Sequence, residues 1–415
     1  MNKELKQKIK KVIRPFVPRF IINRYNLFKF SMKIKDTVQK CSKPYVKGKR
    51  PSGINLYGDF ELGTGLSRSV NLLRDDMECA GVPFSIHQIE EFSGIPVEEK
   101  KEQSDYAINV FHIQPSLIPF LFDYVPQSVR DEHYNIAHWA WETPEIPREW
   151  IPLCNLFDEI WTPSAFVAKA LRKVTDKPIK VYPHAVYQGK EDKIDTIEFR
   201  KKINVDPNAF LCLAMFDGFS GTERKNPDAA IRVFNRAFSD APDDVFLLVK
   251  EKNPSGADAK HLSELLGNTK NVVRIKGQLS YEETEEILAS VDAFISLHRA
   301  EGFGLPVAEV MQYGGVVLST DYSATKEFVN EKNGCPVKYK LVRTQKDYGL
   351  YRAGTIWADP DEEDAALKLR TIYDDPVLRK SIGENAKKTI REQFSKEKIG
   401  KRIAARVKAI CGADI

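Results

Sequence analysis

A chain of 415 residues is longer than the roughly 250–300 residues over which one hydrophobic core grows, so we expect two domains. Its hydrophobic fraction of 42% and charged fraction of 29% are those of a folded globular protein, which excludes a disordered or low-complexity chain. The net charge of +5 is uneven, because residues 1–50 carry +14 and residues 51–415 carry −9.

The first predicted element is a basic helical arm over residues 1–50. Isoleucine, valine and phenylalanine recur among lysines at helical spacing until Pro15 and Pro18, and a second apolar and basic stretch covers residues 20–35. Such segments suit an anionic membrane surface, where each Lys or Arg contributes about 1 kcal/mol. We predict membrane contact, with a helix packed on the protein itself as the main alternative; we do not expect a nucleic-acid partner.

A strand, loop and helix alternation begins near residue 53 and predicts a first domain over residues 51–190. A strand at 54–57, a glycine-rich loop at 58–65 and a helix at 66–80 form one unit of a parallel sheet. Further strands are predicted at 106–111, 134–140, 159–162 and 180–182, with a helix at 165–174. The domain is expected to end at the polar run 189–193.

The same alternation predicts a second domain over residues 191–375. Strands are expected at 210–216, 245–249, 272–275, 293–297 and 316–319, and helices at 227–238, at 257–266 and after Ser280. Asn226 with Pro227 fits a helix start, and Ser280 with Glu283 fits a capping box. Beyond residue 319 we expect helices, those of residues 376–415 packing back on the first domain. Two doubly wound domains bind ligands at the carboxyl ends of their strands, here across a cleft.

One loop of the second domain combines glycines with two carboxylates. It reads His298-Arg299-Ala300-Glu301-Gly302-Phe303-Gly304-Leu305-Pro306-Val307-Ala308-Glu309 and follows a predicted strand. Gly302 and Gly304 permit close backbone approach, and Pro306 fits the first helical position. Glu301 and Glu309 are both expected to face the cleft, where carboxylates can bind paired sugar hydroxyls.

A second loop of this domain carries two cations before a helix. It reads Phe216-Asp217-Gly218-Phe219-Ser220-Gly221-Thr222-Glu223-Arg224-Lys225-Asn226-Pro227. Arg224 and Lys225, beside a helix N-terminus, can stabilise a negatively charged group such as a phosphate without a metal.

Candidate site residues of the first domain follow its predicted strands. Gly63-Thr64-Gly65-Leu66-Ser67 lacks the third glycine of a dinucleotide fingerprint, which argues against an oxidoreductase. The acceptor region is predicted to contain His112, His138, Trp139, Trp141 and Glu142. Aromatic faces stack on sugar rings, and a histidine can take or hold a proton near neutral pH. A tight turn at Gly65 and structural histidines are the alternatives.

These motifs together resemble the retaining glycosyltransferases of family 4. Glu301 and Glu309 around Gly-Phe-Gly-Leu-Pro, followed by Met311 and Gly314, match its best-known motif. The Arg-Lys-Asn-Pro run resembles a variant of its diphosphate loop. Trp-Ala-Trp-Glu at 139–142, with residues 157–164, resembles a mannosyltransferase-like branch.

The resemblance implies a GT-B fold, retention of anomeric configuration, no required metal and no cofactor beyond the nucleotide-sugar co-substrate. The first glutamate of the motif lies by the donor sugar hydroxyls in that family, and the second binds the nucleotide ribose. The expected catalytic residues are Glu301, His138, Lys225 and Arg224. The expected donor-binding residues are Gly65, Ser220, Arg224, Lys225, Gly302, Phe303, Gly304, Leu305 and Glu309.

Two runs differ from the family pattern, and a third resembles a metal-binding motif. Ser323-Ala324-Thr325-Lys326 replaces a Gly-Gly turn before Glu327, and Tyr182-Pro183-His184-Ala185-Val186 replaces Asn-Gly-Val. These differences concern donor contacts rather than the fold. Asp359-Pro360-Asp361 looks like an Asp-x-Asp metal motif, but it precedes a predicted helix, so we expect helix capping and no metal site.

The expected function is transfer of a hexose-type sugar from a nucleoside diphosphate donor to a hydroxyl of a glycan or lipid-linked acceptor, in surface polysaccharide assembly. No run of about 20 apolar residues and no signal pattern is present, so we expect a cytoplasmic protein, peripheral on the inner face of the membrane. The six cysteines lack metal spacing and are expected to be reduced and idle. The alternatives are an epimerase or phosphorylase on the same fold, a protein O-glycosyltransferase, and a degenerate domain that only binds a partner.

Overall fold

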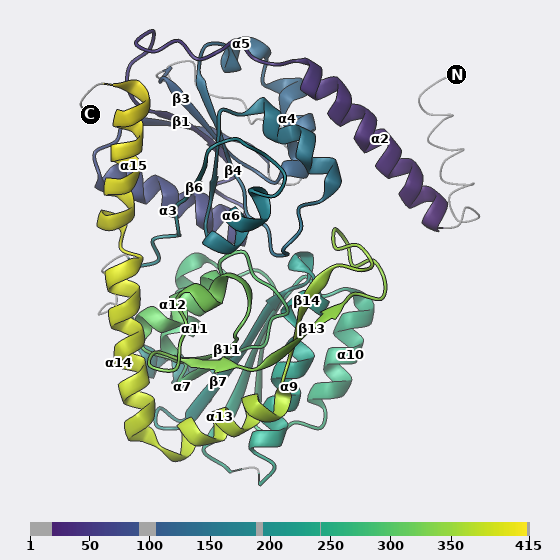
Figure 1. Ribbon diagram of the computed structural model, residues 1–415. Helices are drawn as coiled ribbons and strands as arrows, with labels where there is room; N and C mark the ends of the chain where they lie inside the picture. The colour runs from purple at the N-terminus through teal and green to yellow at the C-terminus, as the bar shows by residue number, and fades with distance from the viewer. Residues whose placement is uncertain (1–18, 91–104, 188–193, 241, 413–415) are drawn as a thin grey trace.

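Two α/β domains make up the molecule, one above the other in Figure 1. The computed structural model describes residues 19–90, 105–187, 194–240 and 242–412, with side chains from residue 29. Each domain is built on a six-stranded parallel sheet. This confirms the predicted pair of doubly wound domains.

The N-terminal sheet has the strand order β2-β1-β3-β4-β5-β6. Its strands are β1 (Ile54–Gly58), β2 (Phe84–Gln88), β3 (Ile108–His112), β4 (Tyr134–His138), β5 (Glu159–Thr162) and β6 (Ile179–Val181). Its helices are α3 (Gly65–Cys79), α4 (Ile118–Tyr124), α5 (Gln127–Arg130) and α6 (Ala165–Leu171), with 3-10 helices η2 (Pro115–Leu117) and η3 (Arg148–Leu156). Successive strands are added on opposite sides of β1, so the crevice between the loops after β1 and β3 is a ligand position of this topology.

The C-terminal sheet has the order β12-β11-β10-β7-β8-β9. Its strands are β7 (Phe210–Asp217), β8 (Val245–Lys252), β9 (Val272–Lys276), β10 (Ala293–Ser296), β11 (Val316–Thr320) and β12 (Cys335–Val337). The domain's helices are α7 (Thr196–Lys202), α8 (Thr222–Lys225), α9 (Pro227–Ala237), α10 (Gly256–Leu266), α11 (Tyr281–Ser290), α12 (Leu305–Tyr313) and α13 (Glu362–Asp374), with 3-10 helices η5 (Gly218–Ser220) and η6 (Ser323–Glu327). The order reverses between β7 and β10, the two strands that precede the predicted motif loops.

Four strands lie where none was predicted. These are β2, β12 and the two strands of an antiparallel hairpin, β13 (Tyr339–Arg343) and β14 (Ile356–Pro360). The helices expected beyond residue 319 are therefore interrupted by strands, and this prediction was wrong for residues 335–360. Four of the five residues of β13 are exposed and its sequence is basic, so no apolar alternation marks it.

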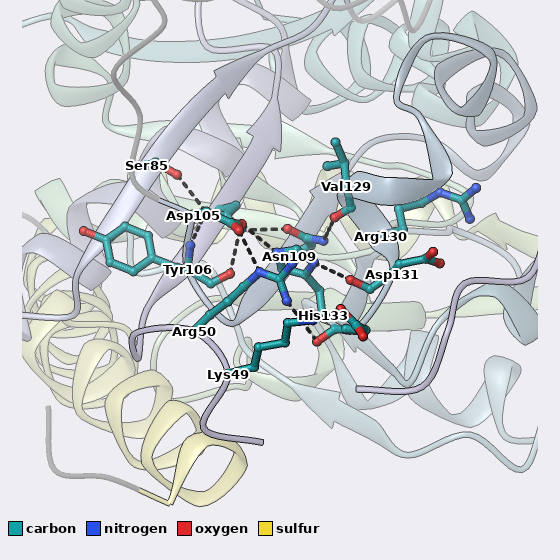
Figure 2. Close-up of polar contacts among 12 residues, drawn as sticks. Lys49, Arg50, Ser85, Asp105, Tyr106, Asn109, Val129, Arg130, Asp131 and His133 are labelled. Carbon is teal, nitrogen blue, oxygen red and sulfur yellow. Dashed lines mark hydrogen bonds and ion pairs between the residues drawn. The ribbon is translucent and has the colours of Figure 1, made fainter. Parts of the chain in front are cut away.

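Residues 29–50 pack on the N-terminal domain. Helix α2 (Arg19–Gln39) lies against η3 and α4, and Ile34 is buried among their side chains. Arg50 bonds Asp105 at 2.6 Å, and His133 contacts the same carboxylate at 2.6 Å, as Figure 2 shows. The alternative of a helix packed on the protein itself therefore describes residues 29–39. The predicted helical segment before Pro18 lies outside the described residues.

The last two helices run along one side of both domains (Figure 1). Helix α14 (Pro376–Gln393) packs on α12 of the C-terminal domain, and α15 (Lys396–Cys411) packs on α3 of the N-terminal domain. The chain thus passes between the domains twice, and the two passages lie side by side, since Tyr187 N donates to Phe394 O at 3.1 Å.

The predicted helix starts are partly confirmed. Ser280 and Glu283 form the expected capping box, and the Asp361 side chain accepts from the backbone N–H groups at the start of α13, as a cap does. Asn226 precedes α9, but it has a left-handed φ of 55° and its side chain donates to Leu297 O instead of capping the helix. In the described part of the chain, no helix has the length and apolarity to span a bilayer.

Candidate active site

Two glycine-containing loops meet where β7 and β10 end. Gly304 has a φ of 94°, and a Cβ there would lie 2.6 Å from Thr325 Cγ2. A Cβ on Gly302 would lie 2.8 Å from Trp141 O, in the other domain. Both glycines are therefore needed for the loop to turn into α12 and to approach the N-terminal domain.

Glu301 lies at the centre of this site and is held by two cations. Its carboxylate is 2.5 Å from Lys225 Nζ and 3.2 Å from the Arg224 guanidinium, and its backbone N–H donates to Ser323 Oγ. Burial raises the pKa of Glu301, but the Lys225 and Arg224 charges outweigh burial and lower it to about 2. Glu301 is therefore ionised at neutral pH.

Arg224 and Lys225 differ in their exposure and in the number of their partners. Arg224 is only 3% exposed and donates to Ser220 O at 2.9 and 3.1 Å and to Ala300 O at 2.7 Å, so it joins the two loops. The Lys225 side chain is 19% exposed and has Glu301 as its partner among the described residues. Lys225 is thus the cation that can reach a ligand with least rearrangement.

Glu309 lies in α12 and is paired across the domain interface. Arg68 of α3 donates to its carboxylate at 3.1 Å, and the guanidinium lies 3.6 Å from the centre of the Tyr281 ring. Burial raises the pKa of Glu309, against the lowering effect of Arg68. Sequence reasoning did not select Arg68; its place in the first turns of the helix after the glycine-rich loop was the available signal.

The glycine-rich loop of the N-terminal domain faces the C-terminal domain. Gly63 O accepts from Lys252 Nζ at 3.2 Å and from the Gln278 side chain at 3.1 Å. Gly65 begins α3, with Thr64 as N-cap, and the space around it is open. The loop therefore lies at the carboxyl edge of the second sheet, beside the ends of β8 and β9.

Three histidines gather at the ends of β3 and β4. His112 and His138 are register partners with rings 4.4 Å apart, and Ser69 Oγ lies 2.7 Å from His112 Nε2 and 3.3 Å from His184 Nδ1. Burial lowers the pKa of His112 to about 4 and that of His184 to about 3, and it puts the pKa of His138 well below its usual range. All three are neutral at pH 7. His184, which sequence reasoning treated only as a departure from the family, belongs to this group.

The two predicted stacking tryptophans are in the core. Trp139 is 2% exposed against Phe157, and Trp141 is 5% exposed against Trp150 and Tyr351. Neither indole offers an open face to a sugar here, because both faces are covered by neighbouring side chains. The stacking role expected from the sequence is therefore replaced by a packing role.

Glu142 lies next to the donor motif rather than apart from it. It accepts from Tyr351 Oη at 3.0 Å and is 3.8 Å from the Arg224 guanidinium. Tyr351 comes from the loop of the β13–β14 hairpin, which reaches from the C-terminal domain into the core of the other. The hairpin residue was not predicted, since nothing in the local sequence indicates this long-range contact.

The remaining donor candidates take supporting positions. Ser220 contributes its carbonyl to Arg224, and Phe303 packs its buried ring against His184 at 4.8 Å. Leu305 is the first residue of α12 and is half-buried. The structure thus brings Glu301, Arg224, Lys225 and Glu142 together, with Glu309 and the histidine group along the same domain interface.

The family match concerns the C-terminal half of the chain. Residues 193–389 match the family Glycosyl transferases group 1. Over these residues the chain is similar to that family. A mannosyltransferase of Mycolicibacterium hassiacum, MMP alpha-(1->4)-mannosyltransferase, is 28% identical over 158 residues, which are 38% of this chain and 34% of that protein. The aligned part is about a third of the relative's length.

Solved structures with little sequence similarity share the fold. Sucrose-phosphate synthase from Thermosynechococcus elongatus has a TM-score of 0.65 at 13% identity, over 88% of this chain and 100% of that one. HepE of Anabaena, solved with UDP and glucose, has a TM-score of 0.59 at 14% identity, over 86% and 100%. A Rickettsia africae glycosyltransferase has a TM-score of 0.61 at 16% identity, over 87% and 98%. At these identities the likeness is one of fold.

Proposed function

We propose that the chain is a retaining, metal-independent glycosyltransferase of family 4. It would move a hexose-type sugar from a nucleoside diphosphate to a hydroxyl of a glycan or lipid-linked acceptor in surface polysaccharide assembly. In this proposal residues 51–190 form the acceptor domain and residues 191–375 the donor domain. The observation that carries it is the cluster of Glu301, Lys225 and Arg224 at the reversal point of the second sheet.

The cluster supplies the charges that the reaction needs. An ionised Glu301 can accept hydrogen bonds from donor sugar hydroxyls, and Glu309 can bind the ribose hydroxyls once Arg68 releases it. Lys225 can stabilise the diphosphate as it departs, with Arg224 holding Glu301 and adding its own field. These roles follow from the family resemblance and are compatible with the distances observed.

The reaction then needs no nucleophile from the protein. The acceptor oxygen bonds to the anomeric carbon on the face that the diphosphate leaves, while the bond from that carbon to the phosphate oxygen breaks. The acceptor proton passes to the departing phosphate oxygen. Neutral His138, with His112 beside it, would accept a hydrogen bond from the acceptor, and Glu142 would help to orient it.

The donor class remains to be assigned, and UDP sugars are the first to test, because HepE was solved with UDP-glucose. The purified chain is incubated with UDP, GDP and TDP sugars, and the products are followed by NMR. Without an added acceptor, water takes the sugar, and release of the nucleoside diphosphate with a free sugar that first appears in the donor's anomeric configuration supports a retaining transferase. An isomerised donor sugar with no nucleoside diphosphate released would support the epimerase instead, and free phosphate consumption would support a phosphorylase.

The basic N-terminal arm would hold the enzyme at an anionic membrane surface. Lys49 and Arg50 pair with Glu132 and Asp105 of the protein itself, so they are not the cations offered to lipid. The proposed contact therefore rests on the earlier part of the arm, whose residues 1–18 hold six Lys or Arg and one Glu. We propose that the enzyme lies on the cytoplasmic face of that membrane.

A further inference from the structure

Lys250 is a buried cation with no partner among the described residues. It is 5% exposed near the carboxyl end of β8, and no described side chain or carbonyl gives its ammonium a hydrogen bond or an ion pair. A buried charge is normally paired, because removing it from water without a partner is costly. Its nitrogen is not among the fully enclosed unpaired polar atoms, so solvent, and therefore a ligand, can reach it.

The register of the sheet places Lys250 on the face of the candidate site. Lys250 is the partner of Met215 on β7, and paired residues of neighbouring strands point to the same side. Met215 packs against the hydrophobic cluster that contains Phe303 of the motif loop and Val307 of α12. Lys250 therefore lies one strand away from the donor motif, on the same side of the sheet.

Lys252 extends this face into the crevice between the domains. It lies two residues further along β8, which puts it on the same side as Lys250. Its ammonium donates to Gly63 O of the opposite domain at 3.2 Å and is 3.6 Å from Asp217. Burial, and secondly the Lys252 charge, lower the pKa of Lys250 below its usual range.

In the part of the chain that the structure describes, the two lysines of β8 have a single carboxylate partner between them. Arg224 and Lys225 are matched by Glu301 and Glu142, and Arg68 is matched by Glu309. Asp217 is the one carboxylate that pairs with either lysine of β8 within the described residues. An anion placed here would restore the balance, and a nucleoside diphosphate carries at least two negative charges at neutral pH.

We infer that Lys250 and Lys252 form a second phosphate-binding pair, which holds the diphosphate of the donor from the β8 side while Lys225 holds it from the β7 side. The inference rests on the proposed function, since it names how the same donor is bound. Lys250 is then a binding residue. Its burial without a partner destabilises the ligand-free protein, and the bound diphosphate offsets this destabilisation.

The test measures binding, without turnover, by isothermal titration calorimetry on the full chain. UDP, GDP and TDP are compared with uridine, guanosine and thymidine, for the wild type and for Lys250→Met. For the nucleoside diphosphate that the wild type binds most tightly, we expect Lys250→Met to bind at least tenfold more weakly than the wild type. For the nucleoside with the same base, we expect the two proteins to have equal affinity. Lys260→Met, the same change at an exposed lysine of α10, is the control and should bind like the wild type.

A melting curve separates ligand binding from a structural role. Because Lys250→Met removes an unpaired buried charge, the ligand-free variant should melt at a temperature equal to or above that of the wild type, while its shift on adding the diphosphate shrinks. A lower melting temperature without ligand, an unchanged diphosphate affinity, or an equal loss for the nucleoside would each overturn the inference. If the wild type itself binds none of UDP, GDP and TDP, the proposed function fails as well.

Discussion

Lys225 and Glu301 are the residue pair on which the donor site depends most directly. Each lies on a loop that follows a central strand, and each is brought to the other by backbone features nearby: the left-handed Asn226 after Lys225, and Gly302 and Gly304 after Glu301. In the structure the Lys225 ammonium and the Glu301 carboxylate form an ion pair with each other. A donor sugar would separate them, giving hydroxyls to the carboxylate and phosphate oxygens to the ammonium.

Removing either charge should therefore reduce turnover more than it reduces stability. We expect Lys225→Met and Glu301→Gln each to lower kcat by about 100-fold, the usual effect of losing one preorganised electrostatic contact. Circular dichroism should show a retained fold, and the exposed-site variant Lys260→Met should keep wild-type rates. Wild-type kcat values in both site variants would remove these two residues from the mechanism.

The buried histidines predict a loss of stability in mild acid. Their folded pKa values, about 4 for His112 and about 3 for His184, lie below the ordinary value of 6.5, so the unfolded chain binds more protons between these limits. Stability is then complete above pH 6.5 and falls as the pH drops toward 4. Replacing His184 by Asn should reduce the slope of unfolding free energy against pH by about 1.4 kcal/mol per unit near pH 5 and by progressively less toward pH 7, measured by urea unfolding from pH 5 to 7. An unchanged slope would show that this imidazole is protonated in the folded state.

At the scale of elements, the C-terminal helices depend on two glycines. A Cβ on Gly400 of α15 would lie 2.3 Å from Asp76 O of α3, and one on Gly383 of α14 would lie 2.3 Å from Gly314 O after α12. Alanine at either position must push backbone away from backbone. Gly400 therefore sets how closely α15 approaches the N-terminal domain, and Gly383 sets how closely α14 approaches the C-terminal domain.

Gly400→Ala should destabilise the protein although alanine favours a helix. We expect a loss of about 1–3 kcal/mol, the usual cost of overpacking, seen as a lower urea midpoint. Gly256→Ala is the matched control, because Gly256 begins α10 and has open space around it. A midpoint for Gly400→Ala equal to that of the control would show that α15 is not packed on α3 this closely.

The elements that carry the site were predictable because they follow simple patterns. Strands β1 and β3 are fully buried and mostly apolar, and the motif loops stand between a strand and a helix. Strand β2 (Phe84–Gln88) alternates apolar and polar residues over its first four positions, which is a strand pattern, but it is only five residues long. Strand β13 is exposed over most of its length and lacks a pattern on which a prediction could depend.

Contacts between residues far apart in the sequence were the part of the site that sequence reasoning missed. Arg68, His184 and Tyr351 each reach a partner more than 100 residues away, so no local spacing indicates them. The stacking role predicted for Trp139 and Trp141 was wrong for another reason. An aromatic ring that can stack on a sugar can equally well pack in a hydrophobic core. Motif residues were identified correctly as neighbours because both motifs follow strands that are adjacent in the sheet.

At the scale of the whole molecule, the domains are held against each other by polar contacts around the site. Glu327 of the C-terminal domain accepts from Ala165 N at 2.9 Å and Phe166 N at 2.6 Å, at the start of α6. Ser164 Oγ donates to Gly302 O at 2.7 Å. With Arg68 on Glu309, these contacts describe a closed arrangement, which a donor must loosen to enter.

Membrane attachment is also a property of the whole molecule, and residues 1–18 test it best. Deleting all of residues 1–50 would remove Ile34 and Arg50, which pack on the N-terminal domain, and would confuse binding with folding. A variant lacking only residues 1–18 should lose most co-sedimentation with phosphatidylglycerol vesicles, while neither protein sediments with neutral phosphatidylcholine vesicles. Equal sedimentation of variant and full chain with anionic vesicles would contradict the proposed role of this segment.

The most direct measurement for the central claim is a crystal structure of the chain with the nucleotide sugar that binds it best. The account predicts one ligand in the crevice, with its sugar at Glu301, its diphosphate at Lys225 and the Gly63–Gly65 loop, and its ribose at Glu309. A donor bound elsewhere, with the Lys225–Glu301 and Arg68–Glu309 pairs intact, would contradict it.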